Sequence, residues 1–210
     1  CIELQTVVIG NSVTTINDDA FAGCPRLWNV TIGNVNSMSS TAFGTQEGNR
    51  AIGAPVTSLV IDSNHLISVD YGEEATFMTT YFPFGGYLQN LTIGASVVKI
   101  GSNAFKGCIG LQRVTIEGSV TEISEGAFSS CDSLNKIEIS LPGSLQTLGS
   151  KAFSGSALTF VDFSQCTTMK EIRESAFQGC RELASVALPE SLTSIGSYAF
   201  AGAQMTEISL

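Results

Sequence analysis

The sequence carries little charge and few residues that perform chemistry. Charged residues make up 14% of the 210 residues, histidine occurs once, and the formal net charge is −9. So acidic a chain lacks the basic surface that nucleic acids and anionic membranes attract, which argues against nucleic acid as a partner. No apolar run reaches the ~20 residues of a bilayer-spanning helix, so we expect no membrane span in this chain.

Catalytic and metal-binding motifs are missing as well. His65 has no partners at the spacing of a catalytic triad or zinc site, and no glycine cluster is followed by the lysine of a phosphate-binding loop. One acidic group carries oxygen ligands suited to calcium, but its spacing matches no calcium loop, and we interpret it as a solvated patch: Asp62, Asp70, Glu73 and Glu74. We therefore expect no enzyme activity, no cofactor and no metal ion.

What the sequence does contain is repetition. The pair Ala-Phe recurs along the chain, and from Phe105 onward the steps between its copies are 23, 25, 24 and 23 residues. Each unit opens with the pattern apolar-x-x-apolar-x-apolar, as in Leu111, Val114 and Ile116, which is typical of a half-buried strand. A second pair of apolar residues, three apart, follows. A period in the twenties indicates a solenoid, in which each coil buries its apolar side against the next.

The repeat predicts the architecture in some detail. Stacked in register, the opening strands would form one continuous parallel sheet with about 4.8 Å per coil, so eight coils would span roughly 40 Å. The phenylalanines would stack as an internal ladder. Glycine after Ala-Phe suits a tight bend with positive φ, and we expect a short helical turn around Ala-Phe. The predicted fold is a strand-dominated α/β solenoid, a curved right-handed coil with one parallel sheet and short helical turns.

The six cysteines fit this repeat better than they fit a disulfide framework. Five share one repeat position: Cys1, Cys24, Cys108, Cys131 and Cys180. Other coils place Ser156 or Ala203 there, so the position favours a small buried side chain. Cysteines on adjacent coils would lie about one coil spacing apart, slightly beyond the usual Cβ separation of a disulfide. We predict buried free thiols, which pack as small apolar groups.

The unit at residues 183–202, LASVALPESLTSIGSYAFAG, resembles the BspA-like class of leucine-rich repeat, and the resemblance extends over nearly the whole chain. It implies a leucine-rich-repeat solenoid. Members are typically surface-exposed or secreted proteins of bacteria and some protozoa, implicated in adhesion and host-protein binding. The resemblance thus implies an extracellular or cell-surface module that binds a protein partner, such as a host surface or matrix protein. The alternative is a structural spacer that displays another domain of a longer protein.

The repeat frame also predicts that residues 1–210 form a single array cut mid-repeat at both ends. Cys1 occupies the position at which the other units end, and residues 205–210 supply only an opening strand. We therefore expect further sequence at one or both ends.

Two regions are candidates for binding a partner. The insert at residues 70–81 is not explained by the repeat and combines acidic with apolar side chains, which suits an interface with a basic partner: Asp70, Tyr71, Glu73, Glu74, Phe77, Met78 and Tyr81. The second region is the outward face of the strands, where charged and aromatic residues gather at Arg113, Lys136, Glu138, Phe160 and Asp162. The insert is the first choice. A neutral elaboration and a merely soluble surface are the respective alternatives.

Overall fold

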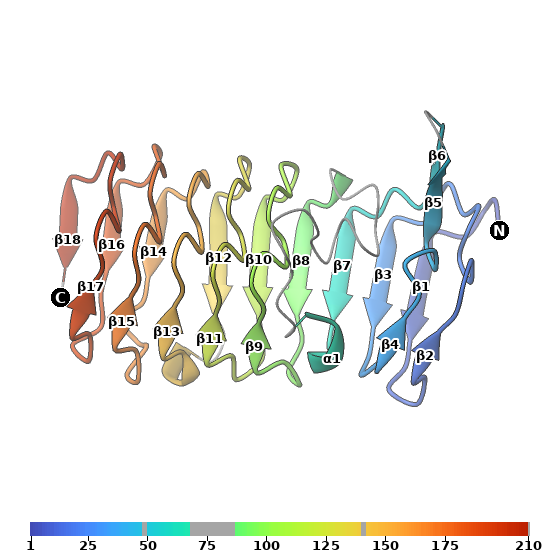
Figure 1. Cartoon of the computed structure of the whole chain (residues 1–210), viewed down its shortest axis with the longest axis horizontal. Helices are drawn as coiled ribbons and strands as arrows, with labels where there is room; N and C mark the ends of the chain where they lie inside the picture. The colour runs from blue at the N-terminus through green and yellow to red at the C-terminus, as the bar shows by residue number, and fades with distance from the viewer. Residues whose placement is uncertain (48–49, 68–86, 140–141, 210) are drawn as a thin grey trace.

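The chain forms an elongated solenoid whose coils stack side by side, with the two termini at opposite ends (Figure 1). This computed structural model describes residues 1–47, 50–67, 87–139 and 142–209. Strands dominate the described residues, and the helical elements are short. The predicted strand-dominated solenoid is confirmed.

The largest sheet forms the first face of the solenoid. Its six parallel strands, in spatial order, are β1 (Thr6–Ile9), β3 (Asn29–Ile32), β7 (Ser58–Ile61), β8 (Asn90–Ile93), β10 (Arg113–Ile116) and β12 (Lys136–Ile139). The strands lie in register, so Arg113 of β10 is opposite both Asn90 and Lys136. Buried apolar and exposed polar side chains alternate along these strands, as a half-buried strand requires: Val114 is fully buried whereas Arg113 points to solvent.

This face is not continuous, so the prediction of one unbroken sheet is wrong. Beyond β12, a separate parallel sheet contains β14 (Phe160–Asp162), β16 (Ser185–Ala187) and β18 (Glu207–Ser209), and within the described residues no ladder joins β12 to β14. The repeat is irregular at this point. Leu134 follows three residues after Cys131, whereas Leu158 follows only two residues after Ser156, which occupies the equivalent position. The same two-residue spacing from Ala203 to Met205 precedes β18, which pairs with β16, so the short spacing alone does not produce the break.

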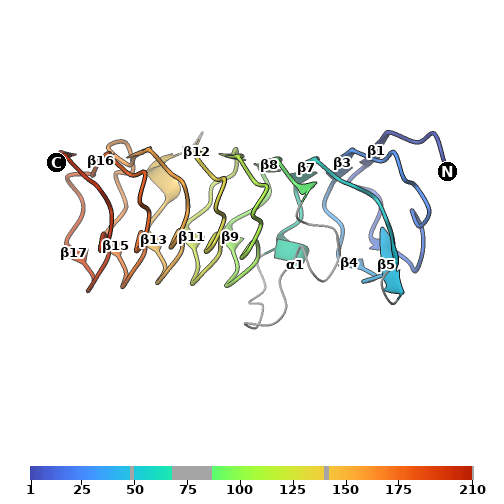
Figure 2. The ribbon, with the colours of Figure 1, turned by 90° about the horizontal axis from the view of Figure 1, so that it is seen from above.

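A second sheet, which the repeat did not predict, forms the opposite face (Figure 2). Its two-residue parallel strands are β9 (Lys99–Ile100), β11 (Glu122–Ile123), β13 (Thr147–Leu148), β15 (Glu171–Ile172) and β17 (Ser194–Ile195). They coincide with the second apolar pair of each unit, and Ile123 and Leu148 are fully buried. Towards the N-terminus, β2 (Thr15–Ile16) pairs with β4 (Ser37–Met38).

The irregular coils contribute the remaining elements. The extra residues after Phe43 form an antiparallel hairpin of β5 (Gly44–Glu47) and β6 (Arg50–Gly53). Helix α1 (Asn64–Ile67) lies between β4 and β9 in Figure 1, and a 3-10 turn, η2, spans Pro142–Ser144.

The expected helical turn at Ala-Phe is instead a series of hydrogen-bonded turns that do not continue as a helix. The residue before Ala-Phe takes a left-handed conformation, as at Lys151 (φ 55°), and the glycine after it does the same, as at Gly155 (φ 73°). Two left-handed residues so close together are incompatible with a continuing right-handed helix.

The predicted aromatic ladder runs through the core. Phe105, Phe128, Phe153, Phe177 and Phe200 stack ring on ring, with centroids 5.4, 5.4, 5.6 and 5.3 Å apart and interplanar angles of 9° or less. The ladder passes the break in the first face without interruption, as does the second sheet. The core therefore holds the coils together where the first face does not.

The cysteines lie beside this ladder as free thiols. All except Cys1 are buried. Cys131 Sγ donates to the carbonyl of Phe105 at 3.2 Å, and Cys180 Sγ donates to that of Phe153 at 3.1 Å. Burial raises the pKa of Cys131 well above its usual value, and burial with a smaller effect of Asp162 raises the pKa of Cys166 to about 11.

Replacing Phe128 with alanine should lower the free energy of unfolding by about 3–5 kcal/mol, because a fully buried ring that stacks on both sides leaves a cavity. Phe200→Ala should cost less, because Phe200 is half-buried and stacks on Phe177. Urea unfolding of both variants measures the difference. Equal losses would contradict the assignment of Phe128 to the centre of the ladder.

Native protein at neutral pH should expose one reactive thiol, that of Cys1, and the five buried thiols should react only after denaturation. The physical reason is that burial keeps the reagent from all five; it also raises the pKa values of Cys131, Cys166 and Cys180, which leaves these three little nucleophilic thiolate. Labelling with a chromogenic disulfide reagent, before and after guanidinium is added, counts them. Recovery of a peptide in which Cys108 is joined to Cys131 would refute free thiols.

Candidate binding surface

The first face presents two outward side chains per strand, and its character changes along the solenoid. On β1, β3, β7 and β8 the outward residues are uncharged: Thr6, Val8, Asn29, Thr31, Ser58, Val60, Asn90 and Thr92. From β10 to β14 the face carries Arg113, Lys136, Glu138, Phe160 and Asp162. All five are exposed or half-buried, as predicted from the alternation.

Lys136 and Glu138 form an ion pair along β12, with Nζ 2.5 Å from Oε1. Lys136 holds the pKa of Glu138 below its usual value by hydrogen bonding and charge, and the charge of Arg113 acts in the same direction. Glu138 Oε2 also accepts a hydrogen bond from Thr115 Oγ1 at 3.5 Å. Glu138 thus remains ionised, and Lys136 is already engaged by an anion of its own strand.

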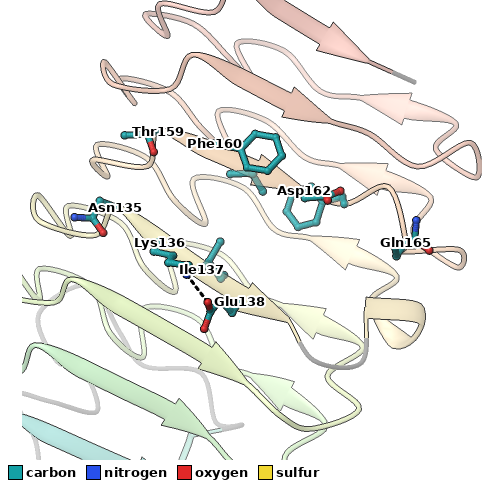
Figure 3. A pocket seen from close by; sticks show the side chains of 10 residues that line it. Asn135, Lys136, Ile137, Glu138, Thr159, Phe160, Asp162 and Gln165 are labelled. Carbon is teal, nitrogen blue, oxygen red and sulfur yellow. Dashed lines mark ion pairs between the residues drawn. The ribbon is translucent and has the colours of Figure 1, made fainter.

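A groove of about 700 Å³ opens where the ladder is broken (Figure 3). One wall comes from residues 135–138 on and before β12, and the other from residues 159–163 and Gln165 on and around β14. The opening leaves Ile137 only partly buried, although Val114 and Val161, at the same repeat position, are buried. An apolar side chain that the neighbouring coils bury therefore forms part of the groove's lining.

Phe160 and Asp162 lie on the β14 side of the groove, opposite the Lys136–Glu138 pair (Figure 3). The side chain of Phe160 is 49% exposed. Asp162 Oδ1 accepts hydrogen bonds from the backbone N–H of Ser164 at 2.9 Å and from its hydroxyl at 2.6 Å, which orient the carboxylate. Among the ion pairs of the described residues, none involves Asp162.

The structure brings together part of the predicted set. Lys136, Glu138, Phe160 and Asp162 line one groove, and Arg113 lies one strand away on β10. The candidates of the insert lie outside the described residues: Asp70, Tyr71, Glu73, Glu74, Phe77, Met78 and Tyr81. Sequence reasoning missed the groove and its other lining residues, among them Asn135, Ile137, Thr159 and Gln165. No signal in the repeat could have located the groove, because the shortened spacing before Leu158 recurs before Met205, where β18 pairs with β16.

The other residues considered as catalytic or metal-binding candidates lie outside the groove. His65 is exposed on α1. Asp62 Oδ1 accepts a hydrogen bond from the backbone N–H of Ser96 at 2.6 Å, which bridges adjacent coils. In the part of the chain that the structure describes, no three acidic, histidine or cysteine side chains cluster so that they could hold a metal ion. Nor does any described helix have the length and apolarity to cross a membrane.

Comparison with known proteins gives one family. The model for the BspA type leucine rich repeat region matches six copies over residues 1–74 and 76–205. A leucine-rich repeat protein of T. pallidum is similar in structure, with 31% sequence identity, a TM-score of 0.54, and a match covering 58% of each chain. One from Bacteroides ovatus has 22% identity and a TM-score of 0.47, and the match covers 94% of this chain and 58% of that chain. The match thus spans less than two thirds of either protein's length. No curated protein matches the sequence.

Replacing Lys136 with methionine should raise the pKa of Glu138 towards its usual value, because the hydrogen-bonded cation is the largest cause of its lowering. Arg113→Met should raise it less, because Arg113 acts through charge alone. Titration of the side-chain carboxyl carbon by NMR measures both. An unchanged pKa in Lys136→Met would show that the ion pair does not form in solution.

Proposed function

The chain belongs to the BspA-type leucine-rich repeat family, and on that basis we propose that it is an extracellular or cell-surface module that binds a protein partner through its repeat surface. The observation that supports this most directly is the groove between β12 and β14. It combines exposed aromatic and apolar surface with charged side chains at its rim, which is the composition of a modest protein interface.

The supporting scaffold suits such a role. Beneath the groove, the phenylalanine ladder and the second sheet continue from coil to coil. A surface held in place before binding loses little conformational entropy when a partner arrives. The insert at residues 70–81, the first choice of contact from the sequence, remains a proposed contact beside the groove, and its acidic and aromatic composition would suit a basic patch on the same partner.

A structural spacer is the second candidate, and the same stacking favours it. A solenoid with an unbroken core is a stiff rod, which can hold another domain at a distance. The two functions differ in one respect: a spacer needs no partner on its repeat surface.

The test is binding of the purified chain to an array of mammalian extracellular-matrix and plasma proteins, at low and high salt. We expect a salt-sensitive interaction that weakens about tenfold when residues 70–81 are deleted, as for the loss of a hot spot. Circular dichroism and thermal melting verify that the deleted chain still folds.

The outcomes separate the alternatives. Unchanged affinity after deletion would remove the insert and leave the first face as the contact. Failure of the chain to retain any protein of the array would contradict binding to host surface or matrix proteins and favour the spacer.

A further inference from the structure

The groove between β12 and β14 is a built feature of one face rather than a general loosening of the solenoid. On the opposite face, β11, β13 and β15 pair without interruption, and in the core Phe128 stacks on Phe153. These contacts connect the same coils that the first face leaves unpaired. The walls of the groove are therefore anchored from below.

The backbone lining the groove offers unused hydrogen-bonding groups. The N–H of Phe163 donates to Ala187 at 2.8 Å, towards β16, so by strand alternation the N–H and C=O of Phe160 and Asp162 point towards β12. The N–H of Lys136 donates to Gln112 towards β10, so Ile137 points its backbone groups towards β14. No ladder joins these two strand edges in the described residues.

A complete strand does not fit between the edges. Inserting one would require the flanking strands to stand roughly 9.5 Å apart, twice the usual spacing. Cα atoms of β12 and β14 come within 8 Å of each other. The groove therefore suits a side chain that enters from a polypeptide lying across it, with backbone groups on both rims available to that polypeptide.

Charge selects the type of side chain. The groove holds Lys136, Glu138 and Asp162, and the first two neutralise each other. Asp162 is left with a carboxylate that is oriented through Oδ1 by Ser164 and has no cationic partner among the described ion pairs, so Oδ2 is available. The ring of Phe160 is half exposed on the same strand, and aromatic faces attract cations.

We propose that the groove binds a lysine or arginine side chain of an extended segment of a partner protein, with the cation against Phe160 and Asp162 and the alkyl stem against Ile137. This inference rests on the proposed function, because it names the contact through which the module would recognise a protein. It also agrees with the net charge of −9, which favours a basic partner.

The experiment selects a displayed library of random heptapeptides on the wild-type chain and counter-selects on the Phe160→Ala/Asp162→Asn double variant. Phe160 and Asp162 are both exposed, so these two substitutions should leave the core and the fold intact. We expect a lysine or arginine to be enriched at one peptide position. Replacing it with norleucine or citrulline, which removes the charge, should abolish most of the binding in fluorescence anisotropy.

Single variants at the same two positions separate the contribution of the charge from that of the ring. Asp162→Asn should weaken the selected peptide about fivefold, as for an exposed ion pair at the upper end of the usual range, and should not affect the norleucine or citrulline peptide. Phe160→Ala should weaken binding about tenfold. Glu207→Gln is the matched control, because it removes one negative charge from the same face on β18 and should change nothing.

Two results would overturn the inference. One is selected peptides without a shared basic residue, and the other is peptides whose affinity is the same for wild type and Asp162→Asn. A protein from the matrix array that bound the wild type and the Phe160→Ala/Asp162→Asn double variant equally would uphold the proposed function and overturn the groove as its site.

Discussion

Stacking of each coil's apolar interior on the next is the constraint on which this structure depends. The coils are too short to enclose a core of their own. The phenylalanines, the leucines and the small residues at the cysteine position are therefore buried by their equivalents on adjacent coils. The ladder from Phe105 to Phe200 shows this most directly, because its rings keep nearly constant separations of 5.3 to 5.6 Å. The buried thiols follow the same logic and fill space beside the rings.

This constraint acts on the core more strictly than on the two faces. The second sheet continues past the point where the first is broken, and the first sheet continues past α1, where β4 and β9 do not pair. At each place, one face tolerates an irregular coil because the other face and the core preserve the stacking. The solenoid can thus alter one surface without losing its fold, and the groove beside Phe160 is such an alteration.

Charged side chains, rather than the buried thiols, determine the chemistry of the described first face. Burial raises the pKa of Cys131, Cys166 and Cys180, which makes these thiols poor nucleophiles. Glu138 is kept ionised by Lys136, whereas Asp162 across the groove has no such partner in the described ion pairs. A face with these properties is suited to recognition, and the selectivity of the groove would come from the carboxylate of Asp162, which no described ion pair compensates.

The sequence by itself determined the solenoid, the strands of its first face, the phenylalanine ladder and the buried thiols. Each of them follows from a local residue pattern that recurs in nearly every repeat unit. It also placed Lys136, Glu138, Phe160 and Asp162 on one face, since alternation along a strand decides direction. It did not reveal the second sheet, whose two-residue strands are too short to carry a period of their own.

The groove was decided by tertiary structure alone. The spacing before Leu158 recurs before Met205, yet β18 pairs with β16 whereas β14 does not pair with β12, so the break has no local signature. Likewise, Ile137 matches the buried Val114 in sequence position, yet it is partly exposed because of what its neighbouring coil does. Pairing between coils depends on two segments that are distant in sequence, so the sequence of either segment alone does not predict it.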